Sequence, residues 1–480
     1  MKPRRIIARL DIKGPNVVKG LHFDGLRVVG DPAKLARKYY EQGADEILYI
    51  DIVASLYERN SLLDIVERAT SAGIYVPMTV GGGVRNVEDI RKLLRAGADK
   101  VAINTAAVRN PNLIREASQI FGAQLIVGSI EAKRREDGTW ESYIDNGRER
   151  TGKDAVAWAK ELVELGAGEL LVTSVDRDGT KRGYDLELIK AITGAVSVPV
   201  IAAGGAGSAE HVRDCLIDTG CDAAAIATSL HYGTEDILSV RTALQNAGIA
   251  LREVNRAIES ESVPSAGHVV SVVDYGAGNM FSVVNAFATI GVTVKVVTSA
   301  PDIETAKLLV LPGDGAFGYA MKQLADRGLI EPIKRYAASG RPLLGICLGM
   351  QLLLTQSEEF GNHQGLNLIP GKVRRFDEKP RDGDSHYRVP HIGWNALQAP
   401  PDVEWEGTIL QDTPSGSEVY FVHSFVTEPI DASDVLASAT YGGVQFCAVL
   451  HRANITATQF HPEKSGEVGI SMMRRFAESS

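Results

Sequence analysis

The amino-acid sequence predicts an α/β protein in which a closed (β/α)8 barrel is followed by an open α/β sheet. The chain has 480 residues, more than one ordinary hydrophobic core accommodates. Short apolar segments alternate with amphipathic segments, and the stretch 253–267 is polar and contains Ser, Pro and Gly. We therefore predict a barrel over residues 1–252, a linker over 253–267 and a second domain over 268–480.

Composition narrows the class of protein before any motif is considered. The formal net charge is −9 and the pI about 5.7, with no basic stripe that would favour nucleic acid. No apolar run reaches the roughly 18 residues of a membrane span, and the basic start has too short an apolar stretch for a signal peptide. Four cysteines without CxxC or disulfide spacing favour a reducing compartment. The sequence thus predicts a cytoplasmic protein with no nucleic-acid or membrane partner, no metal and no other cofactor.

The barrel prediction depends on short apolar segments that alternate with helical patterns through the first domain. Eight such strand–helix units over about 250 residues are the usual content of a closed parallel barrel. The predicted strands are, in order, 6–12, 46–52, 76–82, 100–105, 125–132, 169–176, 198–205 and 223–228.

The two halves of this region resemble each other. "VPMTVGGGVRNVED" parallels "VPVIAAGGAGSAEH", and across the region the offset stays between 120 and 123 residues. This repeat indicates a duplicated half-barrel, in which Asp11 and Glu131 are equivalent positions near the ends of strands one and five. Those strands face each other across the mouth, where the catalytic groups of such barrels lie. A single acid there could simply accept bonds from loop amides, but a symmetric pair favours general acid–base catalysis.

Two glycine pairs are also related by the repeat, Gly82–Gly83 after strand three and Gly204–Gly205 after strand seven. Each pair lets backbone N–H groups approach an anion at the start of the next helix. Asn104 with Thr105, and Thr228, follow the neighbouring strands and would complete the two cradles. A lone glycine pair is usually only a turn. Two related pairs predict two phosphate sites, and therefore an elongated ligand with a phosphate at each end.

The second domain carries a cysteine in "LLGICLGMQLLL", between a predicted strand and a predicted helix. Cys347 then lies on a tight turn that resembles a nucleophile elbow, where a helix N-terminus favours a thiolate. His461 and Glu463 in "QFHPEKS" would supply a base and its orienting carboxylate from one face of a strand. A single cysteine is more often a buried apolar residue, yet the glycines and the His-x-Glu favour a catalytic triad. "LPGDGAFG" would offer backbone N–H groups to an oxyanion.

These motifs resemble two known families. "GICLGMQ" with "FHPEKS" is similar to the class I glutamine amidotransferases, and "DYGAGN", "PGDGAFG", "VPHIGWN" and "YFVHSF" to the glutaminase part of imidazole glycerol phosphate synthase. The first domain resembles the cyclase part of the same family through "VGGGVRNVED", "INTAAV" and "TSVDRDGTKRGYD". The resemblance covers nearly the whole chain. It implies a bifunctional enzyme of histidine biosynthesis that hydrolyses glutamine through a cysteine thioester.

The resemblance also implies substrates and further site residues. Ammonia would pass through the barrel, across an interface between the two domains. It would join a bisphosphorylated ribulosyl aminoimidazole substrate, giving imidazole glycerol phosphate and an aminoimidazole carboxamide ribonucleotide. Gln351 and Glu359 would hold glutamine, and the Gly313 and Gly315 backbones would lie at the oxyanion loop. Lys19 matches the lysine of the loop after strand one. The remaining implied residues are Tyr420, His423 and Ser424 near glutamine, and Asp178 and Thr180 after strand six.

Four charged residues stand at the starts of predicted strands one, two, four and six: Arg5, Glu46, Lys100 and Glu169. Two cations and two anions on one rim predict a salt-bridged ring. A solvated ring would contribute little to stability, but all four match the family's ammonia gate, which we favour.

The sequence departs from the family pattern at Arg9, where a small residue is usual, at Glu131 in place of aspartate, and at Asp314 in place of a small apolar residue. The order of the two domains is a further departure, because the barrel precedes the glutaminase in this chain. By strand parity Arg9 points into the barrel, where a lone buried charge is costly. We expect it to bridge to Asp11, to Glu131 or to both, and to slow cyclisation.

Two other functions remain open at this point. One is a related fusion that supplies ammonia to a different acceptor, for amidine formation in surface sugar synthesis. The other is a binding or scaffold protein whose barrel no longer catalyses. The intact Cys-His-Glu set argues against complete loss of activity.

Overall fold

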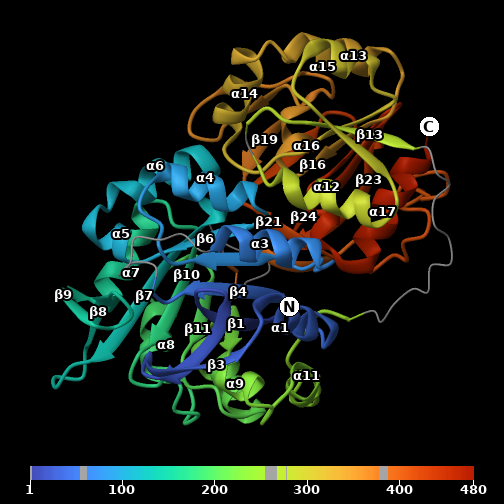
Figure 1. Cartoon of the computed structure of the whole chain (residues 1–480). Helices are drawn as coiled ribbons and strands as arrows, with labels where there is room; N and C mark the ends of the chain where they lie inside the picture. Colours follow the sequence, from blue (N-terminus) through green and yellow to red (C-terminus); the bar gives the residue numbers. More distant parts are fainter. Residues whose placement is uncertain (1–2, 54–61, 255–267, 277, 378–386, 480) are drawn as a thin grey trace. The chain divides into compact units, whose positions relative to one another are not determined.

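The computed structural model describes residues 3–53, 62–254, 268–276, 278–377 and 387–479, and these fall into two compact units (Figure 1). The first unit comprises Met1–Ser118, Ala123–Arg252 and Arg388–Pro390, and the second Gln119–Gly122, Glu253–Tyr387 and His391–Ser480. Apart from Glu253 and Val254, the predicted linker lies outside the described residues. Among the described residues, no helix combines the length and apolar character that a bilayer crossing requires.

The described part of the first unit contains a closed barrel of eight parallel strands, as predicted. The ring closes because the first and last strands of the path, β10 and β7, also pair, with Thr173 opposite Glu131. Strand β1 is four positions from β7 around the ring, so the two strands face each other across it. The strands in ring order are β1 (Arg5–Lys13), β4 (Glu46–Asp51), β5 (Met78–Gly81), β6 (Lys100–Ile103), β7 (Ile126–Arg134), β10 (Glu169–Ser174), β11 (Val200–Ala203) and β12 (Ala223–Ile226).

Helices alternate with these strands along the chain (Figure 1). The first helix begins at Pro32, whose fixed φ suits a helix start, and Asp31 caps it by accepting a bond from Lys34 N at 3.0 Å. The helices of this unit are α1 (Pro32–Glu41), α3 (Leu62–Ser71), α4 (Val87–Arg95), α5 (Thr105–Arg109), α6 (Asn112–Phe121), α7 (Ala155–Glu164), α8 (Leu186–Thr193), α9 (Ala209–Thr219), α10 (Thr228–His231) and α11 (Ile237–Asn246), with a 3-10 turn η1 (Ala123–Leu125).

The half-barrel repeat extends to two hairpins that the strand pattern did not predict. Strands β2 (Asn16–Leu21) and β3 (Asp24–Gly30) follow β1, and β8 (Trp140–Ile144) and β9 (Glu149–Asp154) follow β7. Each hairpin continues one of the two longest barrel strands above the mouth, so each carries side chains over the equivalent carboxylates Asp11 and Glu131.

The barrel is filled by apolar side chains, so it is a packed core. Its members come from seven of the eight barrel strands: Ile7, Leu48, Ile50, Ala102, Val127, Leu171, Ile201, Ala203, Ala223 and Ala225, with Val18 and Phe23 from the first hairpin. The last residue of the unit is also fixed, because Arg252 Nε binds Asp45 Oδ1 at 2.5 Å and Arg241 Nη1 binds the same oxygen at 2.9 Å. These bonds anchor the chain where the barrel ends.

The described part of the second unit is built on an open seven-stranded sheet, in the order β14-β13-β15-β16-β25-β24-β23. The first five strands in this order are parallel, and β24 is antiparallel to both of its neighbours, β25 and β23. They are β13 (Val269–Val273), β14 (Thr293–Val297), β15 (Leu308–Leu311), β16 (Leu343–Ile346), β23 (Val435–Tyr441), β24 (Val444–Arg452) and β25 (Ile455–Thr458). Smaller sheets contain β17 (Gln356–Ser357), β18 (His363–Gln364), β19 (Gly371–Arg375) and β22 (Phe425–Pro429), and β20 (His391–Ala396) with β21 (Glu418–His423).

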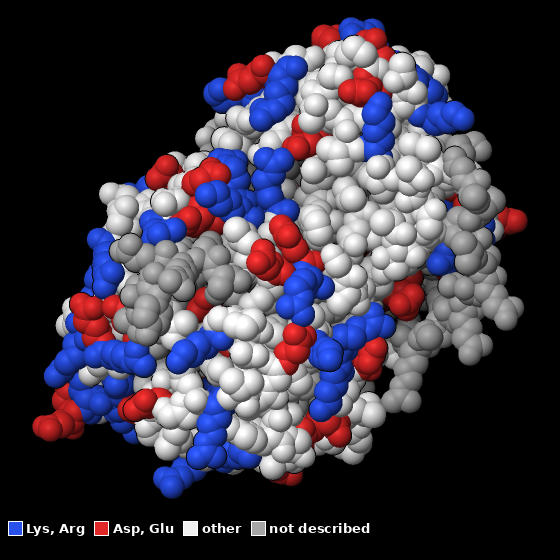
Figure 2. Space-filling view, viewed as in Figure 1, with Lys and Arg blue, Asp and Glu red and all other residues white. Residues whose placement is uncertain are grey.

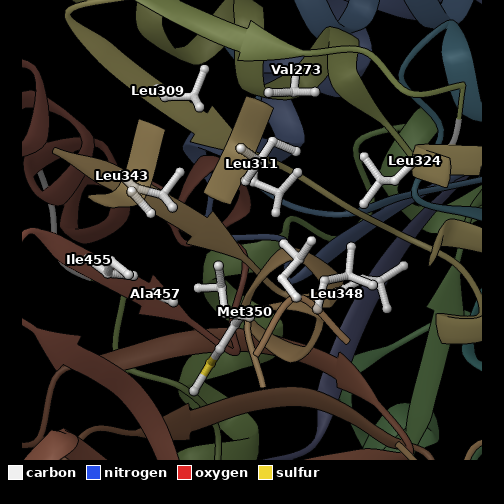
Figure 3. Close-up of a cluster of buried hydrophobic side chains, with 14 of the residues drawn as sticks. Val273, Leu309, Leu311, Leu324, Leu343, Leu348, Met350, Ile455 and Ala457 are labelled. Atoms are coloured by element: carbon white, nitrogen blue, oxygen red, sulfur yellow. The ribbon is translucent and has the colours of Figure 1, made fainter. Parts of the chain in front are cut away.

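A buried apolar cluster fixes the central strands of this sheet against its helices. Figure 3 shows Leu311 of β15 and Leu343 of β16 near Leu348 and Met350, which follow the cysteine. All four side chains are essentially buried. The helices of the unit are α12 (Met280–Thr289), α13 (Ala300–Thr305), α14 (Phe317–Asp326), α15 (Ile330–Ala338), α16 (Leu348–Leu352) and α17 (Gly466–Glu478), with 3-10 turns η2 (Ala432–Asp434) and η3 (Pro462–Lys464).

The contribution of this cluster to stability can be measured by comparing a buried isoleucine with an exposed one. Ile333 of α15 is fully buried, whereas Ile430 is 81% exposed. We expect Ile333→Ala to lower the free energy of unfolding by about 2–5 kcal/mol, and Ile430→Ala to change it by less than about 0.5 kcal/mol. Denaturant unfolding of the full chain, followed by tryptophan fluorescence, measures both values. Equal effects would mean that the cluster does not support the sheet.

Candidate active sites

The cysteine turn has the strained backbone typical of a nucleophile between a strand and a helix. Cys347 follows β16 directly and precedes α16, with φ 51° and ψ −105°. Such a positive φ is unfavourable for a residue with a side chain. The strain is opposed by a hydrogen bond from Cys347 N to the carbonyl of Thr458 at 2.7 Å, on the adjacent strand β25. The sheet therefore holds the thiol at its carboxyl edge.

The flanking glycines are needed because the turn passes close to neighbouring backbone. A Cβ on Gly349 would lie 1.9 Å from the carbonyl oxygen of Leu311, and one on Gly345 would lie 3.1 Å from the Cβ of Ala457. The first contact is a clash that no side chain avoids. The two glycines thus allow the turn to pack against β15 and β25.

His461 and Glu463 lie beside this turn, but not on a strand as the sequence analysis expected. Strand β25 ends at Thr458, and His461 instead precedes the 3-10 turn η3, which contains Glu463. That strand assignment was wrong, because Pro462 has no N–H for a ladder and starts a turn. The turn still brings the pair together: His461 Nδ1 is 2.8 Å from Glu463 Oε1.

The surroundings of His461 favour its charged form. Burial alone would lower the pKa of His461, but the nearby Cys347, Glu463 and Asp314 raise it well above its usual value. A cysteine sulfur, a ring nitrogen of His461 and an Asp314 oxygen all lie within 4.8 Å of one another. The geometry suits a cysteine–histidine pair oriented by a carboxylate.

Asp314 is the unexpected member of this group. Its Oδ1 lies 3.3 Å from His461 Nε2, and its Oδ2 accepts a hydrogen bond from Asn279 N at 2.9 Å. It stands between Gly313, whose carbonyl accepts a bond from Leu348 N at 3.2 Å, and Gly315, whose φ is 127°. The predicted oxyanion loop therefore reaches the cysteine turn and carries a carboxylate with it.

The residues implied for glutamine lie at different distances from the thiol. Gln351 Nε2 donates to Gln459 Oε1 at 3.1 Å, and Gln459 Nε2 lies 3.7 Å from the Cys347 sulfur. Glu359 accepts a bond from Phe317 N at 2.7 Å, at the start of α14, and burial raises the pKa of Glu359 to about 7. Both side chains are buried.

The three implied residues on and after β21 approach the turn through their backbone and their rings. The Tyr420 carbonyl accepts a bond from His461 N at 3.1 Å. His423 Nε2 is 3.1 Å from His391 Nδ1, and burial lowers the pKa of His423 to about 4. The Ser424 carbonyl accepts a bond from Phe376 N at 3.0 Å. Tyr420 is thus the member of this group that contacts His461 directly.

The barrel mouth is occupied by a buried group of two cations and two anions, which we call the mouth quartet: Arg9, Asp11, Lys19 and Asp178. Arg9 Nε binds Asp11 Oδ1 at 2.8 Å, and Lys19 Nζ binds Asp11 Oδ2 at 2.6 Å and Asp178 Oδ1 at 2.9 Å. Each of the four side chains is at most 4% exposed. Burial opposes the charge of Asp11, yet the Arg9 and Lys19 cations hold its pKa well below the usual range.

Arg9 points into the barrel, as its strand parity predicts. Its Nη1 donates to Thr173 Oγ1 at 2.9 Å, so the guanidinium spans from β1 to β10. The ring of Phe23, from the first hairpin, lies 5.5 Å from the Arg9 guanidinium carbon and 5.6 Å from Lys19 Nζ. The guanidinium binds Asp11 and not Glu131 among the ion pairs of the described residues.

Glu131 is the carboxyl group left outside the mouth quartet. It is 7% exposed, and its Oε2 accepts a hydrogen bond from Gly147 N at 2.8 Å. Burial raises the pKa of Glu131 to about 7, against the opposing effect of that bond and of Arg9. The duplication therefore places equivalent carboxyl groups in unlike environments, one permanently charged and one able to exchange a proton near neutral pH.

The first predicted phosphate cradle lines a cavity of about 260 Å³, together with Glu131. Gly82 and Gly83 have φ of 100° and 70°, and a Cβ on Gly82 would lie 2.2 Å from the carbonyl of Asp51. Asn104 and Thr105 lie at the start of α5 in the same lining. Two cations missed by the sequence analysis, Arg85 and Arg109, also line this cavity.

The second predicted cradle has matching backbone geometry. Gly204 and Gly205 have φ of 89° and 109°, and a Cβ on Gly205 would lie 2.1 Å from the carbonyl of Gly183. Thr228 begins α10, as its equivalent Thr105 begins α5. Thr180 lines a separate hollow beside Arg177 and Arg182. The structure therefore brings Lys19 and Asp178 together.

The opposite end of the barrel carries a second neutral group, the base quartet of Arg5, Glu46, Lys100 and Glu169. Each of the four is the first residue of its strand and at most 1% exposed. Lys100 Nζ lies 2.6 Å from Glu46 and 2.5 Å from Glu169, and Arg5 pairs with the same two carboxylates. Burial opposes the charge of Glu169, but the Arg5 and Lys100 cations lower its pKa below the usual value. The predicted ring is thus a closed, buried one.

Several residues of these sites were not predicted from the sequence. Thr173 could have been found, because it shares strand parity with Glu169 and so faces inward with Arg9. Phe23 and Gly147 could not, because both lie in hairpins whose course over the mouth no local pattern encodes.

On the face drawn in Figure 2, acidic and basic side chains are interspersed.

Comparisons with known proteins assign the two regions of the chain. The family model described as histidine biosynthesis protein matches residues 5–236, and the model of class-I glutamine amidotransferase matches residues 271–479. The chain is similar to the imidazole glycerol phosphate synthase subunit HisF of Myxococcus xanthus, with 51% identity over 254 residues, which is 53% of this chain and 100% of that protein.

Two further HisF subunits show the same extent of similarity. The Legionella pneumophila protein is 58% identical over 207 residues, which is 43% of this chain and 97% of that protein. The Bacillus cereus protein is 50% identical over 252 residues, which is 52% of this chain and 100% of that protein. The chain therefore belongs to the imidazole glycerol phosphate synthase family, as a HisF-type barrel joined to a class I glutamine amidotransferase domain, and is a bifunctional enzyme of histidine biosynthesis.

Proposed function

We propose that the cysteine turn releases ammonia from glutamine and that the barrel mouth joins it to a ribulosyl substrate with two phosphates. The observation that carries the first half is the convergence of Cys347, His461 and Glu463 on one strained turn. The second half is supported by equivalent carboxyl groups and equivalent glycine pairs around one mouth. The products would be imidazole glycerol phosphate and an aminoimidazole carboxamide ribonucleotide.

In the glutaminase half, the Cys347 thiolate would attack the side-chain amide carbon of glutamine, aided by His461 as base. The tetrahedral oxyanion would be held by backbone N–H groups of the 313–315 loop, and His461 would return the proton to the leaving ammonia. Water would then hydrolyse the thioester. Glu463 holds Nδ1, so that Nε2 faces the reacting atoms. Gln351 and Glu359 are proposed to hold the amino-acid end of glutamine.

In the barrel half, Glu131 is proposed as the group that moves protons, since burial raises its pKa to about 7. Asp11 would instead stay ionised, because Arg9 and Lys19 both bind it. Its role would be to orient Lys19 and to stabilise positive charge that develops on the substrate. The two carboxyl groups are given different roles because they have different partners, although they occupy equivalent positions in the repeat.

The two phosphate groups are proposed to bind the backbone at Gly82–Gly83 and at Gly204–Gly205. Both pairs have positive φ, which turns successive N–H groups toward one point. Arg85 and Arg109 line the first cavity and would add charge complementarity. The base quartet is proposed as the gate by which ammonia enters the barrel, and the neutral molecule would need only a small displacement of one cation.

A second candidate function is favoured by one observation, the Arg9 side chain inside the barrel. Its guanidinium fills space that a small residue would leave open and binds one of the two carboxylates. The chain would then supply ammonia to another acceptor, such as one that forms an amidine. Turnover of the bisphosphate with ammonium salt distinguishes the two functions.

The division between two sites is tested by Cys347→Ala. The thiolate makes ammonia and does not take part in cyclisation, so this variant should lose glutamine-dependent turnover and keep ammonium-dependent turnover near the wild-type rate. Formation of imidazole glycerol phosphate is followed with each nitrogen source, and Cys447→Ala serves as the buried-cysteine control. Loss of both activities in Cys347→Ala alone would contradict the two-site proposal.

The role of Arg9 is tested by Arg9→Cys combined with Glu131→Asp. Removal of the guanidinium breaks its ion pair with Asp11 and leaves space inside the barrel. The shorter aspartate at position 131 gives the separation of carboxyl groups that the family pattern implies. We expect the pair to raise ammonium-dependent kcat more than either single change does. A double variant slower than wild type would show that Arg9 assists the reaction.

The titration of Glu131 has a consequence for stability. Burial raises its pKa from an ordinary 4.5 to about 7, so between these values the folded chain binds more protons than the unfolded chain. Stability due to this group is therefore present at low pH and falls as pH rises through 7. We expect Glu131→Gln to gain up to about 3 kcal/mol over wild type between roughly pH 4.5 and pH 8. Denaturant unfolding at both pH values measures this, with the exposed Glu136→Gln as control.

A further inference from the structure

Three side chains at the cysteine turn present one sulfur, one nitrogen and one oxygen donor to a common point. The donor atoms of Cys347, His461 and Asp314 all lie within 4.8 Å of one another. Cys347 and His461 are 5% and 4% exposed, and the Asp314 side chain 11%. Hydrolysis of glutamine as proposed above uses the first two residues and gives Asp314 no task.

His461 is oriented toward that point by the rest of the site. Its Nδ1 is held by Glu463 at 2.8 Å, while its buried Nε2 faces Asp314 Oδ1 at 3.3 Å and lies beside the Cys347 sulfur. An imidazole fixed by a carboxylate on one nitrogen, with the other nitrogen turned toward further donor atoms, is the usual arrangement of a metal-bound histidine. Asp314 is fixed in the same manner, since Asn279 N donates to Oδ2 and leaves Oδ1 facing the histidine.

The spacing of the donors suits a tetrahedral ion. Around a tetrahedral zinc ion the ligand atoms lie roughly 3.3–3.8 Å apart, given bonds of about 2.0–2.3 Å. His461 Nε2 and Asp314 Oδ1 are already 3.3 Å apart, so a small rotation of the Cys347 side chain would complete the set. A thiolate with an imidazole selects zinc and similar transition ions over magnesium or calcium.

We propose that Cys347, His461 and Asp314 form a binding site for Zn²⁺ or a similar divalent transition ion, which reversibly blocks the cysteine. The ion takes the place of the one proton shared by the cysteine and the histidine, and that proton is released to solvent. Three protein ligands leave the fourth position to water. A metal-bound sulfur no longer attacks an amide, so occupancy excludes glutamine hydrolysis. Only this effect on turnover rests on the proposed function; binding itself does not.

Cobalt provides a readout that does not depend on activity. We expect the metal-stripped full chain to bind one equivalent of Co²⁺ with a sulfur-to-cobalt charge-transfer band in the near ultraviolet. Cys347→Ser should lose this band. Asp314→Asn should weaken Co²⁺ binding by at least about tenfold. Zn²⁺ should displace the cobalt and protect Cys347 from alkylation.

The control is Cys447→Ser, a buried cysteine of the same unit that lies outside the cluster. It should keep both the band and the affinity, and tryptophan fluorescence checks that all variants are folded. Absence of cobalt binding in the wild-type chain, a band retained in Cys347→Ser, or equal affinity in Asp314→Asn would each overturn the proposal. Metal binding without any glutamine hydrolysis in the metal-free chain would leave it standing and contradict the proposed function instead.

Discussion

The requirement that buried charges be compensated determines what the barrel can contain. A charge removed from water costs several kcal/mol unless an opposite charge and hydrogen bonds replace the solvent. The barrel meets this requirement twice, with Arg5 and Lys100 against Glu46 and Glu169 at one end, and Arg9 and Lys19 against Asp11 and Asp178 at the other. The apolar layers of the core lie among residues of the same strands and carry no charge.

The same requirement explains why the two halves of the duplicated barrel have diverged in chemistry. The mouth quartet is neutral without Glu131, which forms no ion pair among the described residues, and burial raises the pKa of Glu131 to about 7. Asp11, at the equivalent position, binds two cations and stays ionised. Two bound cations at Asp11 and burial at Glu131 therefore give unlike states to carboxyl groups that the repeat alone would make equal. The cysteine turn shows the complementary case, in which three neighbours of His461 favour its charge.

Much of this arrangement could be predicted from the sequence, because the apolar pattern locates each strand. Once a strand is located, the residues at its two ends are known. The four members of the base quartet stand at the starts of apolar segments that predict strands, and each is the first residue of its strand. The opposition of Asp11 and Glu131 followed from the repeat and the closed ring. What could not be predicted depends on contacts distant in sequence. The hairpin that brings Phe23 over Arg9, the Gly147 amide at Glu131 and the 3-10 turn at Glu463 all depend on tertiary packing rather than local pattern.

If small molecules cross the barrel as proposed, the neutrality of both quartets would determine which kind of solute passes. An ion on this axis would lose its hydration and meet no uncompensated counter-charge, since each cation present is already bound to carboxylates. Ammonium, chloride and free phosphate would all face this barrier, whatever their sign. An uncharged molecule of a few atoms would not, because it has little hydration to lose. An interior of this kind would discriminate against charge, in addition to the barrier that its packed side chains present to size.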